Sequence, residues 1–406
     1  MTRVAVVGAG FAGLAAAVDL MDAGVDVVVL EARDRVGGRV WSEPLDGPGG
    51  TGPVIERGAE FVLDGYDVMR GWLDRVGLRL VDTGMSYYVR EPRGAGDVAV
   101  ADLRAAGAAL AAAPREAGDS VTDLLARLEV RPAVAEAVRA RVEVSCAWPA
   151  DDLVASVVDH VASFADLPSH RVEGGNQSLA TRMAALLGPR VRLGVAVRMV
   201  GHSARGVLLE TTAGTDLVDA VVLAVPLPVL RDLDVTPPFR YDKRQALDRL
   251  TTGVAAKVHV GLRSPAPPSA VLSVPDRFWC WTASGADGRV PPVLNGFAGS
   301  PEAVAALASD PDVWLRRLAD LRDDLDLDLG SVVVTTWHDD PWARGAYSAD
   351  GLRALPGDAA LVAAPEGRVF VAGEHTAGEW SGLMEGALRS GSRAAREVVG
   401  ELGVRR

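Results

Sequence analysis

The chain has 406 residues, of which 49% are hydrophobic and 24% are charged, and this length and composition suit a globular protein with two domains. Its formal net charge of -12 argues against a nucleic-acid or anionic-membrane partner, because phosphate groups would be repelled over most of the surface. An acidic surface can instead attract a cationic substrate such as an ammonium.

The two cysteines, Cys146 and Cys280, belong to no CxxC motif. We therefore expect two free, buried thiols in a reducing compartment, with no metal site and no disulfide framework. The first predicted strand starts at Arg3 or Val4, and no uninterrupted apolar run reaches the ~18 residues of a membrane span. We expect no signal peptide, no membrane partner and a cytoplasmic location.

The first forty residues predict a complete βαβ unit. A buried strand, residues 4–7, leads into a turn with Gly8, Gly10 and Gly13, and a helical stretch and a second strand ending in Glu31 follow. In a dinucleotide-binding unit such glycines allow a tight turn, close approach of the backbone to a pyrophosphate, and close packing of helix on sheet. The carboxylate of Glu31 would accept hydrogen bonds from the ribose hydroxyls and would repel a 2′-phosphate, so the unit predicts an adenosine diphosphate group without that phosphate.

A second glycine-rich turn follows the acid, and it carries arginine. It includes Ala32, Arg33, Gly38 and Arg39. Together the two turns resemble those of the flavin-dependent amine oxidases, the monoamine oxidase-like family of FAD enzymes. In that family the second turn lies along the diphosphate and ribityl chain, so the resemblance implies that Arg39 contacts the cofactor.

Later segments extend the resemblance over the whole chain, least over residues 97–165. Residues 54–61 match the turn beside the flavin ring, and residues 368–391 match a strand, turn and helix whose N-terminus would stabilise negative charge on the ring. Val197 stands where the family's backbone meets the adenine, although without the family it would be plain strand core. The cofactor contacts that the resemblance implies are Gly8, Gly10, Phe11, Ala12, Gly13, Glu31, Ala32, Arg33, Gly38, Arg39, Gly58, Ala59, Glu60, Phe61, Val197, Gly373, Glu374, Gly382, Leu383 and Met384.

The pattern of elements predicts an α/β protein in which a Rossmann-like FAD-binding domain is joined to an α+β substrate domain of mixed sheet and helices. We assign residues 1–83, 169–240 and 341–406 to the FAD-binding domain, and residues 84–168 and 241–340 to the substrate-binding domain. The stretch 301–325 is predicted to be helical, and residues 191–200 and 206–212 are predicted to be paired strands.

The candidate catalytic residues are Lys257, Tyr347 and Trp337. Lysine occurs only at 243 and 257, and the pattern alone leaves Lys257 equally open to interpretation as a solvated strand residue. The resemblance implies that Lys257 holds a water near flavin N5 and assists reoxidation. Large aromatic residues are usually core, but here the resemblance implies that they form the walls of an amine site. The predicted substrate contacts are Phe61, Tyr347, Trp342, Trp380 and Leu383.

The chain departs from the monoamine oxidases at two positions. Ala346 stands where those enzymes attach flavin through a cysteine, so we expect FAD to be bound non-covalently. Leu383 replaces the second aromatic residue of their substrate cage, which favours a bulkier amine or a natural-product intermediate over a simple arylalkylamine. His375 is a weaker candidate for a base, because lone histidines are more often structural.

These observations predict an FAD-dependent oxidase that converts an amine to an imine, with dioxygen as the acceptor and hydrogen peroxide as the product. Alternatives are a flavin desaturase or dehydrogenase acting on C–C bonds of a hydrophobic metabolite, since fold does not fix function, and a non-enzymatic module that retains a nucleotide. The expected partners are a small amine and dioxygen, and a homodimer is left open.

Overall fold

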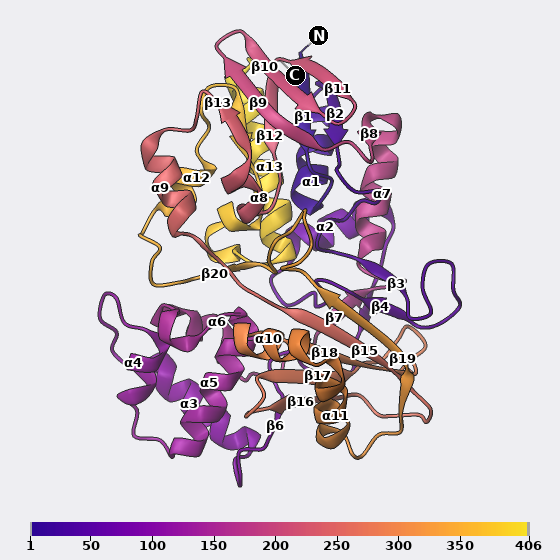
Figure 1. Ribbon diagram of the computed structural model, residues 1–406, viewed down its shortest axis with the longest axis vertical. Coiled ribbons are helices and arrows are strands. Elements are labelled where there is room, and N and C mark those ends of the chain that lie inside the picture. The colour runs from indigo at the N-terminus through magenta and orange to yellow at the C-terminus, as the bar shows by residue number, and fades with distance from the viewer. Residues whose placement is uncertain (1, 404–406) are drawn as a thin grey trace.

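The computed structural model describes residues 2–403, apart from the side chains of residues 308, 309 and 311. Two parts are stacked along the long axis, and the chain crosses between them several times (Figure 1). The upper part contains both ends of the chain and the helix α13, and the lower part contains the middle of the chain. The protein is of the predicted α/β class.

A five-stranded parallel sheet forms the centre of the upper part, in the order β21-β12-β1-β2-β8. Its central strands are continuous apolar runs because helices or a second sheet cover both faces. The strands are β1 (Arg3–Val7), β2 (Asp26–Leu30), β8 (Val191–Arg192), β12 (Ala220–Leu223) and β21 (Val369–Val371).

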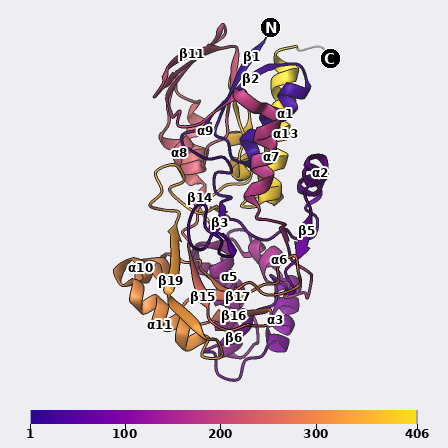
Figure 2. The ribbon, with the colours of Figure 1, turned by 90° about the vertical axis from the view of Figure 1, so that its right-hand side faces the viewer.

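Helices cover one face of this sheet, and a smaller sheet with three helices covers the other (Figure 2). Helix α1 packs most extensively against the C-terminal helix α13, which brings the two ends of the chain together. The first layer contains α1 (Phe11–Asp22), α2 (Asp67–Val76), α7 (Gln177–Leu187) and α13 (Met384–Glu401). The second contains β9 (Val197–Ser203), β10 (Gly206–Thr211), β11 (Gly214–Val218), β13 (Asp234–Thr236), α8 (Leu227–Asp232), α9 (Tyr241–Arg249) and α12 (Asp358–Ala363).

The lower part is built on a six-stranded mixed sheet in the order β19-β15-β18-β17-β16-β6. Its strands are β6 (Glu91–Arg93), β15 (Ala256–Leu262), β16 (Ser269–Ser273), β17 (Phe278–Thr282), β18 (Val293–Ala298) and β19 (Leu327–Thr336). One face packs on α3 (Val100–Ala112), α4 (Val121–Ala126), α5 (Pro132–Cys146) and α6 (Val158–Val161). The other packs on α10 (Pro301–Ser309) and α11 (Pro311–Leu321).

Short pairs of strands and single turns of helix complete the two parts and the segments between them. They are β3 (Ser42–Pro44) with β4 (Val54–Glu56), β5 (Leu80–Asp82) with β7 (His170–Val172), β14 (Thr251–Thr252) with β20 (Ser348–Ala349), and turns at Ala150–Asp152, Ala155–Val157, Gly188–Arg190, Glu374–Thr376 and Gly378–Trp380. None of the helices in residues 2–403 is long and apolar enough to cross a membrane.

Two local predictions need correction. The stretch 301–325 forms two helices, because Asp310 ends the first and caps the second by accepting hydrogen bonds from the backbone N–H groups of Asp312 and Val313. Residues 191–200 do not form one strand: Val191 and Arg192 join the parallel sheet, and the chain turns before β9. Helix α9 packs against α12 of the upper part, and the domain boundaries stay a prediction.

Candidate functional site

The first glycine turn connects β1 to α1 and leaves space beside its backbone. Gly8 has a φ of 101°, and a Cβ there would lie 2.7 Å from the carbonyl oxygen of Ala224. A Cβ on Gly13 would lie 1.9 Å from the Gly8 oxygen, so Gly13 permits the close packing of α1. No described atom lies within 4 Å of a Cβ built on Gly10, the N-cap residue of α1. The turn therefore offers an open backbone at a helix N-terminus, which suits an anionic ligand.

The second glycine turn is held directly against the first. The Gly37 amide donates to the Ala9 oxygen over 2.8 Å. Glu31 is buried, and its carboxylate accepts hydrogen bonds from the amides of Ala9 at 2.6 Å and Arg33 at 2.9 Å. The predicted ribose-binding acid thus also fixes the two turns relative to each other.

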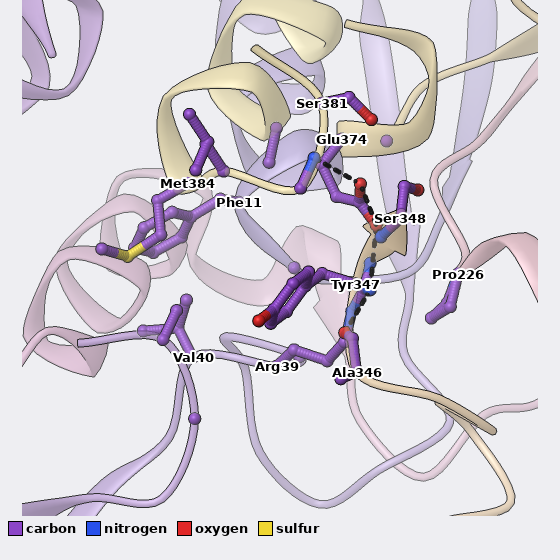
Figure 3. A pocket seen from close by; sticks show the side chains of 18 of the residues that line it. Phe11, Arg39, Val40, Pro226, Ala346, Tyr347, Ser348, Glu374, Ser381 and Met384 are labelled. Carbon is purple, nitrogen blue, oxygen red and sulfur yellow. Dashed lines mark hydrogen bonds and ion pairs between the residues drawn. The ribbon is translucent and has the colours of Figure 1, made fainter. Parts of the chain in front are cut away.

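The C-terminal turn carries a partly buried ion pair. Arg39 donates to Glu374 Oε1 over 2.9 Å and to the Ala346 carbonyl oxygen over 2.6 Å. Glu374 Oε2 in turn accepts from the Gly382 amide over 2.8 Å, which fixes the segment that leads into α13 (Figure 3). Burial, the largest single effect, would raise the pKa of Glu374, but Arg39, His375 and the hydrogen bonds from Ser348 and Gly382 together hold that pKa below its ordinary value.

These segments border one cavity of about 620 Å³, which lies between the two parts of the molecule. Pockets of this size typically hold a cofactor or small molecule. Every predicted cofactor and substrate residue lines this cavity except Gly13, which lies behind the turn in the contact of α1 with β1. Val197 of β9 also lines this cavity, and its contact with the adenine stays a prediction.

Lys257, on β15, faces the cavity and forms a buried ion pair. Its Nζ lies 2.7 Å from Glu60 Oε2, 3.2 Å from the Gly58 oxygen and 5.2 Å from the centroid of the Trp281 ring. Burial would raise the pKa of Glu60, but Lys257 and Arg171 lower it below its ordinary value. The solvated-strand interpretation of Lys257 is therefore wrong, because the side chain is only 4% exposed.

The predicted aromatic walls come from three segments. Tyr347 projects into the cavity (Figure 3), and its hydroxyl donates to the Ser145 carbonyl over 2.8 Å, so that the ring is fixed in position. Trp337 is buried and donates to the Arg57 carbonyl over 3.0 Å. Trp342 is 38% exposed at the rim, and Trp380 packs edge-on against Tyr66.

The structure adds Tyr87, Trp279 and Arg90, which the sequence did not predict, to the predicted Phe61. Tyr87, Trp279 and Phe61 pack together, with ring centroids 5.3 to 5.8 Å apart, and Trp279 stacks on Trp281 at 4.0 Å. Arg90 lies against this group and also lines the cavity. The alternation in β17, which places both tryptophans on one face, was the only available sequence signal.

His375 does not line the cavity, so it is poorly placed to act as a base there. Burial lowers its pKa to about 4, so it is neutral near pH 7. Both cysteines are free and buried, as predicted, and the described residues contain no cluster of ligands suited to a metal ion.

Comparison with known proteins identifies the family. The family model for flavin-containing amine oxidoreductases matches residues 11–131 and 145–399, which is most of the chain. The chain belongs to this family. The match begins at the start of α1 and includes the Lys257 strand and most of the C-terminal helix, all of which contribute residues to the cavity.

Relatives of this oxidoreductase are similar along their whole length. A Mycobacterium tuberculosis protein named flavin-containing monoamine oxidase AofH is 30% identical, with 98% of this chain and 96% of that protein covered. Amine oxidase [flavin-containing] A of Sus scrofa is 26% identical, with 99% and 86% covered. The two proteins are amine oxidases by name.

Solved structures share the fold. A putrescine oxidase bound to putrescine has a TM-score of 0.81 at 23% identity, covering 98% of this chain and 99% of that one. The cyclohexylamine oxidase of Brevibacterium oxydans has a TM-score of 0.84 at 21% identity, with 99% of both chains covered. The family's cofactor is FAD, and the open Gly10 backbone, the helix N-terminus and the buried acid of this amine oxidoreductase fit it.

Proposed function

We propose that this oxidoreductase converts an amine to an imine, with dioxygen as the final electron acceptor. A C–H and an N–H bond of the substrate break and a C=N bond forms, so two electrons and two protons leave. When bound, FAD supplies the two-electron acceptor and passes the electrons to dioxygen, which becomes hydrogen peroxide. Water then hydrolyses the released imine to a carbonyl compound and an amine or ammonia.

A single observation carries the proposal. One cavity runs from the glycine turn at the N-terminus of α1 to the buried pair of Lys257 and Glu60. A nucleotide at the turn and an amine at the pair would therefore share one enclosed space. Enclosure supports the reaction because it orients the C–H bond and excludes water.

The chain's own residues orient the substrate amine, stabilise negative charge beside α13 and position a water. Tyr347 offers a ring whose hydroxyl is already bonded to the backbone, so the ring can position a neutral amine without rotating. Glu374 and Arg39 hold the start of α13 against the cavity, where its dipole favours negative charge. We assign Lys257 the positioning of a water, because Glu60 and the Gly58 carbonyl leave one of its three donors free for it.

We further propose that the substrate is bulkier than a simple arylalkylamine. Leu383 lines the cavity where the related enzymes are expected to have an aromatic side chain, and an aliphatic side chain leaves more room. Replacing Leu383 with tyrosine should therefore lower kcat/KM for large amines at least tenfold and leave that for small amines within about threefold.

The experiment is to follow oxygen consumption and peroxide release with small and large primary, secondary and polyamine substrates. The proposal predicts equal amounts of oxygen consumed and peroxide formed, together with a carbonyl product. Formation of a C=C bond in a hydrophobic metabolite, with no amine oxidised, would instead support the desaturase alternative.

A further inference from the structure

Two buried arginines, Arg90 and Arg141, have no carboxylate partner among the residues that the structure describes. Arg90 is 2% exposed and lines the cavity, and Arg141 is fully buried behind it on α5. A buried cation without a counter-charge is costly, since a protein interior solvates charge poorly. Such a residue on a cavity wall therefore points to a ligand that carries the missing charge.

The other buried cations of the described chain follow the usual rule. Lys257 faces Glu60 at 2.7 Å, Lys243 faces Glu366 at 3.6 Å, and Arg322 faces Asp324 at 2.9 Å. Each of these pairs lies within the protein and needs no ligand. Arg90 and Arg141 are exceptional in this respect, and they are neighbours.

The neighbours of Arg90 hold the guanidinium in place without neutralising it. Its Cζ lies 3.7 Å from the Trp279 ring centroid and 4.8 Å from that of Tyr87, and its Nε donates to the Tyr87 carbonyl over 3.3 Å. Its Nη1 is buried and finds no hydrogen-bond partner in the described part of the chain. Stacking on aromatic rings offsets part of the cost of burial, and the hydrogen-bonding capacity of Nη1 is left unused by these residues.

Arg141 adds a second positive charge next to Arg90, on the side away from the cavity. It donates to Ser145 Oγ, its Cζ lies 5.3 Å from the Tyr87 ring centroid, and its Nε is buried without a partner among the described residues. The Ser145 carbonyl accepts the Tyr347 hydroxyl, so the two arginines are linked to the predicted substrate wall. Burial, together with repulsion from Arg141, lowers the pKa of Arg90 well below its ordinary value, and a bound anion would reverse this.

We infer that Arg90, supported by Arg141, binds a carboxylate of the substrate. The amine that this enzyme oxidises is then a carboxylate-bearing amine, and its body lies against the aromatic group of Phe61, Tyr87 and Trp279. A guanidinium suits this role because its planar donors match a carboxylate. The inference rests on the proposed amine oxidation, and it disfavours diamines, whose second ammonium would be repelled by Arg90.

The acidic side chains that line the cavity are compatible with such a substrate. Asp64, Asp350 and Glu379 border the same space as Arg90. They would attract the ammonium form of the substrate during entry, while the arginines attract its carboxylate. A cavity with both charges selects for a substrate that has both charges.

The first test needs no variant and no turnover. The flavin-loaded protein is titrated with benzoate and, as the matched neutral probe, with benzamide, while the visible flavin spectrum and the thermal midpoint are followed. We expect benzoate to perturb the spectrum and raise the midpoint, and to bind at least tenfold more tightly than benzamide. Equal affinity for both probes, or no binding of benzoate, would overturn the inference.

The second test places the effect on Arg90. Arg90→Gln should weaken benzoate at least tenfold, and Arg90→Lys should recover part of this loss because it retains the charge. The matched control is Arg115→Gln, since Arg115 is paired with Asp159 in the same part of the molecule but away from the cavity. If the Arg90 variants retain flavin and bind benzoate as tightly as the control does, the assignment is wrong.

The third test separates this inference from the proposed function. Phenethylamine and L-phenylalanine, and likewise tryptamine and L-tryptophan, are compared as anaerobic reductants of the bound flavin. A preference of at least tenfold for the carboxylated member, lost in Arg90→Gln, supports both proposals. Reduction only by phenethylamine and tryptamine, which lack the carboxylate, overturns the carboxylate site and keeps amine oxidation. Tight benzoate binding with no reduction by any amine keeps the anion site and overturns amine oxidation.

Discussion

The buried pair of Lys257 and Glu60 makes a quantitative prediction about stability. In Lys257→Met the Glu60 carboxylate stays buried but loses its nearest cation, which lies 2.7 Å away. Trp281 Nε1 still donates to it over 2.9 Å, and Arg171 remains at 3.4 Å. Removal of one partner from a buried pair costs about 3 to 5 kcal/mol. We therefore expect a loss near the lower end, about 3 kcal/mol, because two partners of Glu60 remain.

The assay is urea unfolding of the flavin-saturated protein, followed by tryptophan fluorescence, with the change in unfolding free energy taken from midpoint and slope. The matched control is the double variant Lys257→Met with Glu60→Gln, in which no buried carboxylate is left without its lysine. Arg171, 14% exposed, loses its ion pair but keeps its hydrogen bond to the Ser284 carbonyl, so most of the loss should be recovered. The deficit of the single variant should also be smaller at pH 5 than at pH 8. Without Lys257 the pKa of Glu60 rises, so more of Glu60 is protonated at pH 5 than at pH 8, and burial of the neutral carboxyl group destabilises the fold less than burial of the carboxylate. A deficit below about 1 kcal/mol, or a double variant no more stable than the single one, would refute the reasoning.

Four further outcomes follow from particular residues. Lys257→Met should slow reoxidation of the flavin by dioxygen more than its reduction by substrate in stopped-flow absorbance, and unchanged reoxidation would remove the lysine from the mechanism. Gly10→Ala should fold normally, because its Cβ meets no other described atom of the protein, yet bind FAD at least tenfold more weakly in a flavin fluorescence titration, because that Cβ fills space meant for the cofactor. Gly13→Ala should lose stability as well, because its Cβ would lie 1.9 Å from a backbone oxygen. Burial raises the pKa of Glu56 from 4.5 to about 7, so wild-type stability should fall as pH rises from 4.5 to about 7 and then level off. Glu56→Gln should be more stable than wild type at pH 8, by up to roughly 3 kcal/mol, but not at pH 4.5. Acid precipitation should leave a colourless pellet and a yellow supernatant, since Ala346 offers no thiol for attachment; a yellow pellet would contradict non-covalent binding.

The cofactor end of the cavity could be predicted because its geometry is local. Gly8, Gly10 and Gly13 follow one strand and open one helix, so their spacing determines the turn and where the helix begins. Glu31 ends the neighbouring strand, and the parallel pairing of β1 with β2 brings it beside the turn. Gly8, Gly10 and Glu31 of this unit line the cavity, whereas Gly13 lies behind the turn, and their individual contacts with FAD stay predictions.

The Arg90 wall could not be predicted because it depends on pairing between distant strands. Residues 91–93 form β6, which joins the sheet beside β16, and this places Arg90 against Trp279 from β17. Nothing in the local sequence determines that register. The burial of Lys243 was missed for the same reason: its helix looks polar, but the chain around Ala364 and Glu366 covers the ammonium.

The environment of Lys257 on β15 could be predicted only in part. Alternation predicts that Lys257 and Val258 point to opposite faces of β15, and solvent on one face would be the simplest outcome. Every residue of β15 is buried, because this strand lies between β19 and β18 and both faces of the sheet are covered. Periodicity determined the side to which the lysine points, and tertiary packing determined that this side is a cavity.

The most direct test of amine oxidation is anaerobic mixing of the purified flavin-loaded protein with amines while the visible flavin absorbance is followed. The set should contain primary, secondary and polyamine substrates together with L-amino acids. We predict that at least one class bleaches the flavin and that admission of dioxygen restores the colour with release of peroxide. A protein that stays yellow with every amine, yet is bleached by a hydrophobic metabolite that gains a C=C bond, would contradict the account.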